Sequence, residues 1–551
     1  MLQRSLGVSA LAVVFGVCGL QAPASASTFD FFSIARALNS AGTSPASKAP
    51  ASGLVQGGPV LPSTPPAEGL GGNSLVPAAP AVTPSQATTH QRLELQMPAD
   101  LHAPEPALEA LTTTLLPQTA QAPGPSSQVP AGQPGSDPSS RWWPHPLNSP
   151  PFPLADWISE SQQPIGETWD VGDGPLQKAL IGTQWDKQRI RLYGWLDFGY
   201  TESTSKHSNF PLSYDVIPNS PVLDQEVMRI ERMPDTVQTA KNDWGFRVTQ
   251  VFGIDYRFLA GDGYFFDQLQ KHNNTYGYDL PEFYGLLYYP KLAPMGGVVQ
   301  IGRYISPADV ECQLAPQNYL YSHTLMYTVD PYTYTGINLQ QQWSKTWSTM
   351  IGIDAGNDKS LWEKDASLNF EFLVGWHSPD NRDDLWFGPD QIGNGHYSFG
   401  HDSEQIWTTT WGHKFNDKWH MQSEYYEMWS YDAEMGGTEI DGPTQSFGGG
   451  GGPTPIIPGM SHAHGYTTYL MYQPDKMSYW TFRTDWLGDP EGWRTGVPNN
   501  MYSLTLGYDH WLSPTTTFRP ELRYEWADHN IYDNGARRTQ MELAADIIFH
   551  F

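Results

Sequence analysis

Sixteen charged residues lie at alternate positions of short segments between residues 189 and 551, beside apolar or aromatic neighbours. Alternate side chains of an extended strand point to opposite faces, so each such segment would have one apolar and one charged face. We expect the charged faces to line one polar interior. The set comprises six arginines and ten carboxylates: Arg191, Arg247, Arg257, Arg483, Arg519 and Arg523, with Asp197, Asp255, Glu371, Glu424, Asp485, Asp509, Glu521, Glu525, Glu542 and Asp546.

Two interpretations of this polar interior stay open. The charges could neutralise one another in a ladder that keeps a wide, hydrated interior rigid. Alternatively, they could form a selectivity constriction in which the acidic excess favours cations or neutral polar solutes. The narrowest ring of a pore sets its selectivity, and the sequence does not show which loop folds inward.

Catalytic arrangements fit the sequence poorly. Glu424 and Glu427 are an odd number of positions apart, so on a strand they face opposite sides and cannot act as an acid/base pair. Ser322-His323 and Ser461-His462 lack a marked nucleophile turn. The sequence therefore predicts no catalytic residue.

Histidines and cysteines suggest no metal site or cofactor. His396, His401, His462 and His464 match no strong metal motif, and loop histidines are usually solvated. Only two cysteines occur, and Cys312 has no partner in the chain if the N-terminal apolar run is removed. We expect neither a metal site, nor a cofactor, nor an internal disulfide.

The elements that would position the charged residues are strands. Period-two segments recur from residue 189 to the end, and counting back with strict alternation gives sixteen strands, with a range of 14–18. An even number returns both ends to the periplasmic side, so we expect an all-β, transmembrane, antiparallel up-and-down barrel. The expected strands are 189–200, 222–233, 244–258, 281–289, 297–305, 333–342, 347–355, 367–377, 384–388, 404–413, 418–430, 465–473, 477–488, 501–511, 516–527 and 540–551.

The connections between these segments alternate in length. Tight turns at 344–346, 416–418, 474–476 and 513–515 alternate with long stretches rich in Gly, Pro or Asn, such as 431–464. Short periplasmic turns and long outer loops are typical of an outer-membrane barrel.

Aromatic residues mark the ends of the expected strands. Trp419 and Trp429 bracket one strand, whose ten-residue separation corresponds to ~25 Å across a membrane at a ~40° tilt. The expected interfacial aromatic girdle is Trp343, Trp347, Trp419, Trp429, Trp486, Trp511 and Trp526. The final strand ends on Phe549 and Phe551, which resemble the aromatic ending that outer-membrane assembly machinery recognises.

The rest of the chain differs sharply in composition. Residues 1–26 resemble a signal peptide, 27–140 a low-complexity disordered spacer and 141–184 a Trp/Pro-rich pre-barrel segment, leaving 185–551 for the barrel. The net charge of -27 argues against nucleic acid as a partner. A mean hydropathy of -0.46 is too polar for a bundle of membrane helices.

Several ordered motifs resemble one known family. They lie at 223–232, 243–248, 251–258, 279–282, 301–304, 321–323, 334–336 and 519–524. In this order they resemble the OmpL-like β-barrel porin family. The resemblance implies a Gram-negative outer-membrane barrel with a pore role, and it supplies no binding residues.

We therefore expect a water-filled channel through which small hydrophilic solutes or ions diffuse passively, with a weak cation bias. Its expected partners are outer-membrane lipid, the assembly machinery and those solutes, and not nucleic acid. The alternative is a secreted, soluble, β-rich protein that binds carbohydrate through its tryptophans. The solute, the oligomeric state and the role of 27–184 stay open.

Overall fold

The computed structural model describes residues 165–166, 174–211, 214–307, 309–364, 366–380, 382–394, 404–436, 455–475, 477–513 and 515–551. The expected signal peptide, the spacer and most of the pre-barrel segment lie outside these residues. No helix in the described ranges is both long and apolar enough to cross a membrane.

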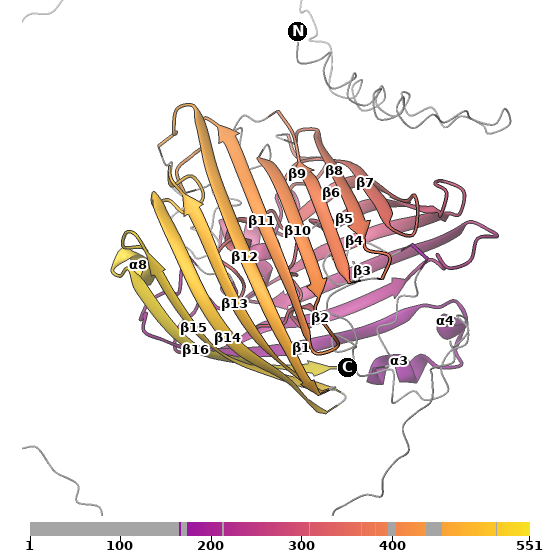
Figure 1. Cartoon of the computed structure of the whole chain (residues 1–551), viewed down its shortest axis with the longest axis horizontal. Coiled ribbons are helices and arrows are strands. Elements are labelled where there is room, and N and C mark those ends of the chain that lie inside the picture. Colours follow the sequence, from indigo (N-terminus) through magenta and orange to yellow (C-terminus); the bar gives the residue numbers. More distant parts are fainter. Residues whose placement is uncertain are drawn as a thin grey trace, which may run out of the picture. The chain divides into compact units, whose positions relative to one another are not determined.

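Sixteen antiparallel strands form a closed barrel, as the alternation predicted (Figure 1). The strands are β1 Arg191–Ser203, β2 Pro221–Arg232, β3 Asp243–Gly253, β4 Gly277–Tyr289, β5 Gly297–Ile305, β6 Thr333–Gln342, β7 Trp347–Asp354, β8 Asn369–His377, β9 Asp383–Gln391, β10 Gln405–Lys414, β11 Trp419–Tyr431, β12 Met460–Asp475, β13 Ser478–Asp489, β14 Asn499–Ser513, β15 Thr516–Ala527 and β16 Thr539–His550.

The barrel closes between its first and last strands. Trp195 pairs with His550 and Ser203 with Glu542, and backbone bonds of 2.9 and 3.0 Å join Gly194 to Phe551. A sheet in lipid must pair all its backbone groups, and closure leaves no open edge.

The third strand is shorter than expected. β3 ends at Gly253, and the chain then turns into the short helix α5, Tyr256–Leu259. Gly253 has a φ of +150°, and an added Cβ would lie 2.0 Å from the Asp224 carbonyl oxygen. The extended backbone ends at Asp255, whose φ of -68° and ψ of -13° are helical, so the expectation of strand structure to residue 258 was wrong. Asp255 and Arg257 belong to the connection between β3 and β4.

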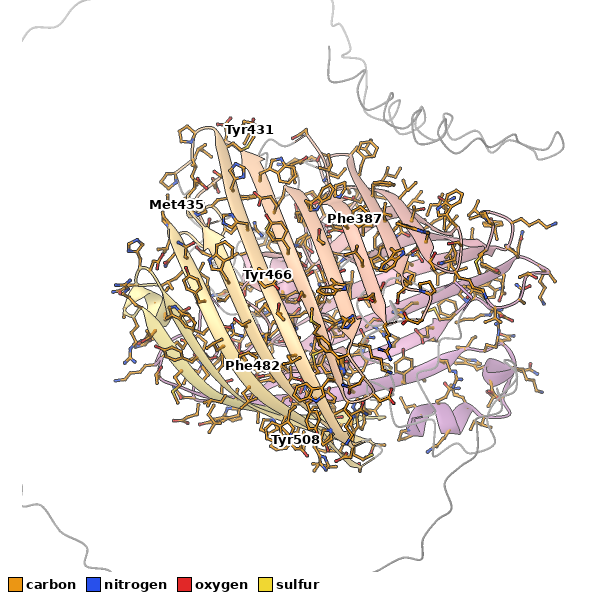
Figure 2. The ribbon with its side chains drawn as sticks, in the orientation of Figure 1. Phe387, Tyr431, Met435, Tyr466, Phe482 and Tyr508 are labelled. Atoms are coloured by element: carbon orange, nitrogen blue, oxygen red, sulfur yellow. The ribbon has the colours of Figure 1, made fainter. Side chains whose placement is uncertain are left out.

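The two faces of the barrel differ in polarity. On β16, Met541 and Leu543 are 50% and 60% exposed, whereas Glu542 is 1% exposed. Tyr466 and Phe482 are likewise exposed on neighbouring strands (Figure 2). The outer surface is therefore apolar and aromatic, and the interior is polar.

Connections at the two ends of the barrel differ in length. The described residues of the connections at one end are 204–211, 214–220, 254–276, 306–307, 309–332, 355–364, 366–368, 392–394, 404, 432–436, 455–459, 490–498 and 528–538. They include the short helices α5, α6 Asp267–Gln270, η2 Ala315–Gln317, η3 Tyr327–Val329 and α8 Tyr532–Gly535. The turns at the other end are mostly shorter.

Two helices precede the first strand. They are α3, Pro175–Leu180, and α4, Gln184–Lys187, drawn beside the end at which the C-terminus lies (Figure 1). The Gln177 side chain is buried and accepts a 2.9 Å hydrogen bond from the Leu192 backbone N–H. The end of the pre-barrel segment is thus helical and packed on β1.

Candidate functional site: the barrel interior and its inward loop

The loop between β5 and β6 folds into the barrel. We call residues 306–332 the inward loop. Its described residues are almost all buried, with Leu314, Leu325 and Val329 at 0% exposure. Its contacts with side chains of β11, β13 and β15 place it across the interior from β5 and β6.

Arg519 on β15 bonds the inward loop directly. Its Nη1 donates 2.7 Å hydrogen bonds to the carbonyl oxygens of Ala315 and Asn318. Its Nε donates at 3.0 and 3.1 Å to the Asp546 carboxylate on β16. Hydrogen bonds to charged groups contribute ~1.5–3 kcal/mol each, so this arginine is a strong link between the loop and the wall.

Two further arginines bond the middle of the loop. Arg483 donates to the Ser322 carbonyl at 2.5 Å and to its hydroxyl at 2.8 Å. Arg523 donates to the His323 carbonyl, and to the Glu525 carboxylate at 2.9 Å. These arginines therefore bind the loop backbone and do not simply line an open lumen.

Carboxylates of the same wall accept hydrogen bonds from backbone N–H groups of the loop. Glu521 accepts from Tyr321 at 3.1 Å and from Ser322 at 3.2 Å, while Asp485 accepts from Leu325 at 2.8 Å. Because a buried backbone group needs a partner, these bonds fix the loop in a single position.

An aromatic stack stiffens the inward loop. The His323 ring stacks on Tyr214 at 4.0 Å and on Tyr327 at 4.7 Å between ring centroids. Its Nε2 lies 2.9 Å from the Cys312 carbonyl oxygen, so this nitrogen carries the proton. Burial lowers the pKa of His323 to about 3, and the ring is neutral at ordinary pH.

A second charged network occupies β2, β3 and β4. Arg247 bonds Glu231 at 2.8 Å and Glu282 at 3.2 Å, and Arg229 bonds Glu282 at 2.6 Å. Only Arg247 was among the residues expected inside. The alternation of Arg229 and Glu231 with outward-facing Met228 was the signal that could have identified that pair.

Three carboxylates lie toward the long-loop end of the wall formed by β7, β8 and β9, apart from Asp384 at the start of β9, which lies 3.1 Å from His377. They are Asp354, Glu371 and Asp390, each no more than 3% exposed. Only Glu371 was expected from the sequence. β6, β7, β8 and β9 contain neither arginine nor lysine, so this wall differs from the arginine-bearing wall of β13 and β15.

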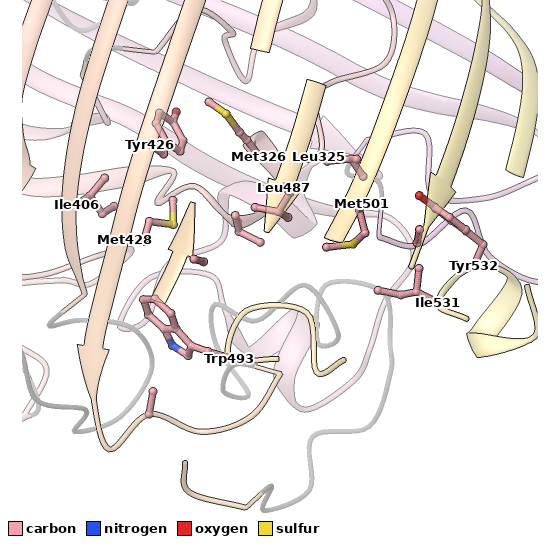
Figure 3. Close-up of a cluster of buried hydrophobic side chains, with 14 residues drawn as sticks. Leu325, Met326, Ile406, Tyr426, Met428, Leu487, Trp493, Met501, Ile531 and Tyr532 are labelled. Carbon is pink, nitrogen blue, oxygen red and sulfur yellow. The ribbon is translucent and has the colours of Figure 1, made fainter. Parts of the chain in front are cut away.

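An apolar cluster fills the long-loop end of the barrel (Figure 3). Leu325 and Met326 of the inward loop meet Met428 of β11, Trp493 of the 490–498 loop and Tyr532 of α8. Trp493 and Tyr532 are completely buried. Residues of several loops thus share one small core at this end.

Most of the charged residues expected inside lie on the buried face of the strands. Arg191 is partly exposed at the start of β1, and the loop residues Asp255 and Arg257 are buried at 2% and 7% exposure. The others are at most 3% exposed: Asp197, Arg247, Glu371, Glu424, Arg483, Asp485, Asp509, Arg519, Glu521, Arg523, Glu525, Glu542 and Asp546.

The tryptophans expected in the girdle do not all share one face. Trp347 and Trp419 are exposed beside short turns, at 46% and 40%. Trp511 instead lies on the inner face of β14, 5% exposed and stacked on His550 at 4.9 Å. It shares this face with Asp509, two positions earlier. The remaining four are half-buried: Trp343, Trp429, Trp486 and Trp526.

Residues 189–551 match the family described as "Putative beta-barrel porin-2, OmpL-like". The chain belongs to this family. It is an outer-membrane β-barrel of the Gram-negative type, and its family and fold are those of a porin channel rather than an enzyme. Membership sets aside the alternative of a secreted, soluble carbohydrate-binding protein.

Solved porin structures resemble the chain only distantly. An anion-selective porin from Comamonas acidovorans is 10% identical, with a TM-score of 0.42, over 66% of this chain and 99% of its own. The outer membrane channel DcaP of Acinetobacter baumannii is 7% identical, with a TM-score of 0.40, over 66% of this chain and 97% of its own. The trimer form of OmpT from Vibrio cholerae is 8% identical, with a TM-score of 0.40, over 66% of this chain and 99% of its own. No curated protein matches the chain.

Proposed function

We propose that the protein is a porin for the passive diffusion of small hydrophilic solutes and ions, with a weak preference for cations. The supporting observation is the charge of the interior. Among the described buried side chains, 25 are aspartate or glutamate and 10 are arginine or lysine. Carboxylates that outnumber their basic partners make the potential inside a low-dielectric barrel negative, which favours cations.

The inward loop supports a narrow passage. It contacts the far wall through Arg519, Glu521 and Asp485, and these interior side chains are at most 3% exposed. A passage beside such a loop admits only small solutes. We therefore expect small conductance steps and exclusion of solutes the size of an oligosaccharide.

The surface features fit the same function. We propose that Trp347 and Trp419 lie at the membrane interface on the short-turn side, because exposed tryptophans favour that depth. We also propose that Phe549, which is 40% exposed, and Phe551, which follows β16, are recognised by the assembly machinery.

Planar-bilayer recording tests the proposal. Purified full-length protein should give discrete conductance steps, and a KCl gradient should give a reversal potential of the sign expected for K⁺ permeating faster than Cl⁻. Absence of steps from a folded sample would overturn the porin function. A reversal potential of opposite sign would overturn the cation preference alone.

A further inference from the structure

Three carboxylates of the β7–β9 wall each accept hydrogen bonds through only one of their two oxygens. Tyr304 donates its hydroxyl to Glu371 Oε1 at 2.5 Å, and Tyr334 donates to Asp390 Oδ2 at 2.6 Å. Asp354 Oδ1 accepts a 3.1 Å hydrogen bond from the Gln391 amide nitrogen. The three side chains are therefore oriented by neutral donors.

The second oxygen of each carboxylate has no hydrogen-bond partner among the described residues. These atoms are Asp354 Oδ2, Glu371 Oε2 and Asp390 Oδ1. The three carboxylates also repel one another when ionised, since Asp354 and Asp390 lie close enough to interact electrostatically with Glu371, and Asp354 with Asp390. Buried carboxylates in this arrangement are strongly stabilised by a positive charge placed among them.

The backbone directs these groups to one place. Gly352 of β7 leaves room for the Glu371 side chain, because an added Cβ would lie 2.7 Å from Glu371 Cδ. The register of β9 against β10 shifts by one residue near Pro389, which is a β-bulge. As a result, the consecutive residues Asp390 and Gln391 are both buried, at 2% and 0% exposure.

Gln391 is an independent indication of a ligand. It is neutral and completely buried, its amide nitrogen reaches Asp354, and its Oε1 has no partner among the described residues. An amide carbonyl oxygen offers the same negative dipole to a cation as a backbone carbonyl. The group thus combines three carboxylates with one carbonyl oxygen.

We propose that Asp354, Glu371, Asp390 and Gln391 hold a small inorganic cation, together with part of its hydration shell, as it crosses the barrel. Among the described residues, no group of three His, Cys, Asp or Glu side chains could hold a metal ion on its own. Binding that keeps part of the hydration shell is weak, and a conducting ion requires weak binding in order to leave. The inference rests on the proposed porin function and assigns its cation preference to this wall.

Reversal potentials of variants test the assignment. Glu371→Gln and Asp390→Asn each remove one charge and preserve shape, and we expect the K⁺/Cl⁻ permeability ratio to fall by ~5-fold, the order expected for one charge acting over several ångströms at intermediate dielectric. Gln391→Leu removes only the carbonyl and should lower the ratio less. The matched control is Asp279→Asn, which alters a buried carboxylate of β4 that pairs with Arg303 of β5 at 3.0 Å and should leave the ratio nearly unchanged.

Each outcome decides a different point. A conducting wild type whose ratio is unchanged in Glu371→Gln and Asp390→Asn would overturn this inference alone. An equal fall in Asp279→Asn would also overturn it, because the preference would then come from the whole interior. A folded wild type without current would overturn the porin function and this inference with it. If one variant did not fold, the other two would give the same decision.

Discussion

Arg519 and Asp546 form an ion pair between neighbouring strands, and the same guanidinium also bonds two carbonyl oxygens of the inward loop. Replacing Arg519 by alanine would free the loop at Ala315 and Asn318 and leave a buried carboxylate unpaired. Breaking a buried pair in this way costs ~3–5 kcal/mol. We expect a lower free energy of unfolding and larger conductance steps.

Arg519→Lys keeps the charge and should lie between wild type and Arg519→Ala in both measurements. Unchanged steps in a folded Arg519→Ala would show that this link does not position the loop.

The two faces of the last strand should respond differently to substitution. Leu543 is 60% exposed on the outer face, and Glu542 is 1% exposed inside. Leu543→Arg should cost ~2–4 kcal/mol near the midplane, whereas Glu542→Gln should fold. Urea titration of refolding into lipid vesicles measures both costs. Equal tolerance of the two changes would contradict the assignment of the faces.

Docking of the inward loop should depend on pH through Asp309. Burial, together with the smaller effect of the nearby Glu311 charge, raises the pKa of Asp309 from 3.8 to about 7, against hydrogen bonds with Tyr426, Asp330 and Ser306 that lower it. Between pH 3.8 and about pH 7, the docked loop therefore binds more protons than the released loop. Docking should be strongest at acidic pH and should weaken as the pH rises through about 7.

Hydrogen exchange of loop peptides, corrected for intrinsic chemical rates, measures this dependence. Protection of residues 309–332 should fall between pH 5.5 and pH 8, values chosen to bracket the raised pKa. Asp309→Asn should flatten the dependence, although Asp330 and Glu424 lie in the same electrostatic group. Protection that rose with pH would contradict the assigned direction.

The apolar cluster at the long-loop end should contribute to stability through Trp493. This side chain is completely buried, and replacing a buried aromatic residue by alanine costs ~3–5 kcal/mol. Trp493→Ala should lower the free energy of unfolding and make the 490–498 loop more susceptible to protease. The matched control is Trp480→Ala, on the outer face at 45% exposure, for which we expect a smaller loss and no new cleavage. Similar effects of both changes would show that the cluster does not hold the loop.

The strands could be predicted from the sequence because each carries its own alternating pattern. The expected 297–305, 333–342 and 516–527 agree with β5, β6 and β15 to the residue. The failure at 244–258 has a physical cause: Ile254, Tyr256 and Phe258 continue the alternation, but they are buried in a loop and a helical turn. A period of two does not distinguish a strand from a loop that packs by chance at the same spacing.

The inward loop could not be predicted from its own residues. Its position depends on side chains more than 150 residues away in the sequence, such as Asp485 and Arg519. The placement of Asp390 and Gln391 depends on a bulge beside Gly388 and Pro389, residue types that often occur at bulges but do not show which side chains become buried. Arg229 and Glu231, in contrast, followed the ordinary alternation and were identifiable. The strands of the barrel wall could therefore be predicted from local periodicity. The position of the inward loop could not, because it depends on charged side chains far away in the sequence.

The seam between β1 and β16 has a consequence for how the molecule is made. Trp195 and His550 are neighbours in space but lie about 350 positions apart in the chain, and closing so long a loop is entropically unfavourable until other contacts already hold the ends together. The other fifteen strand pairs are formed between consecutive strands. We therefore expect the seam to form last, and the sheet to keep an exposed edge until β16 pairs with β1.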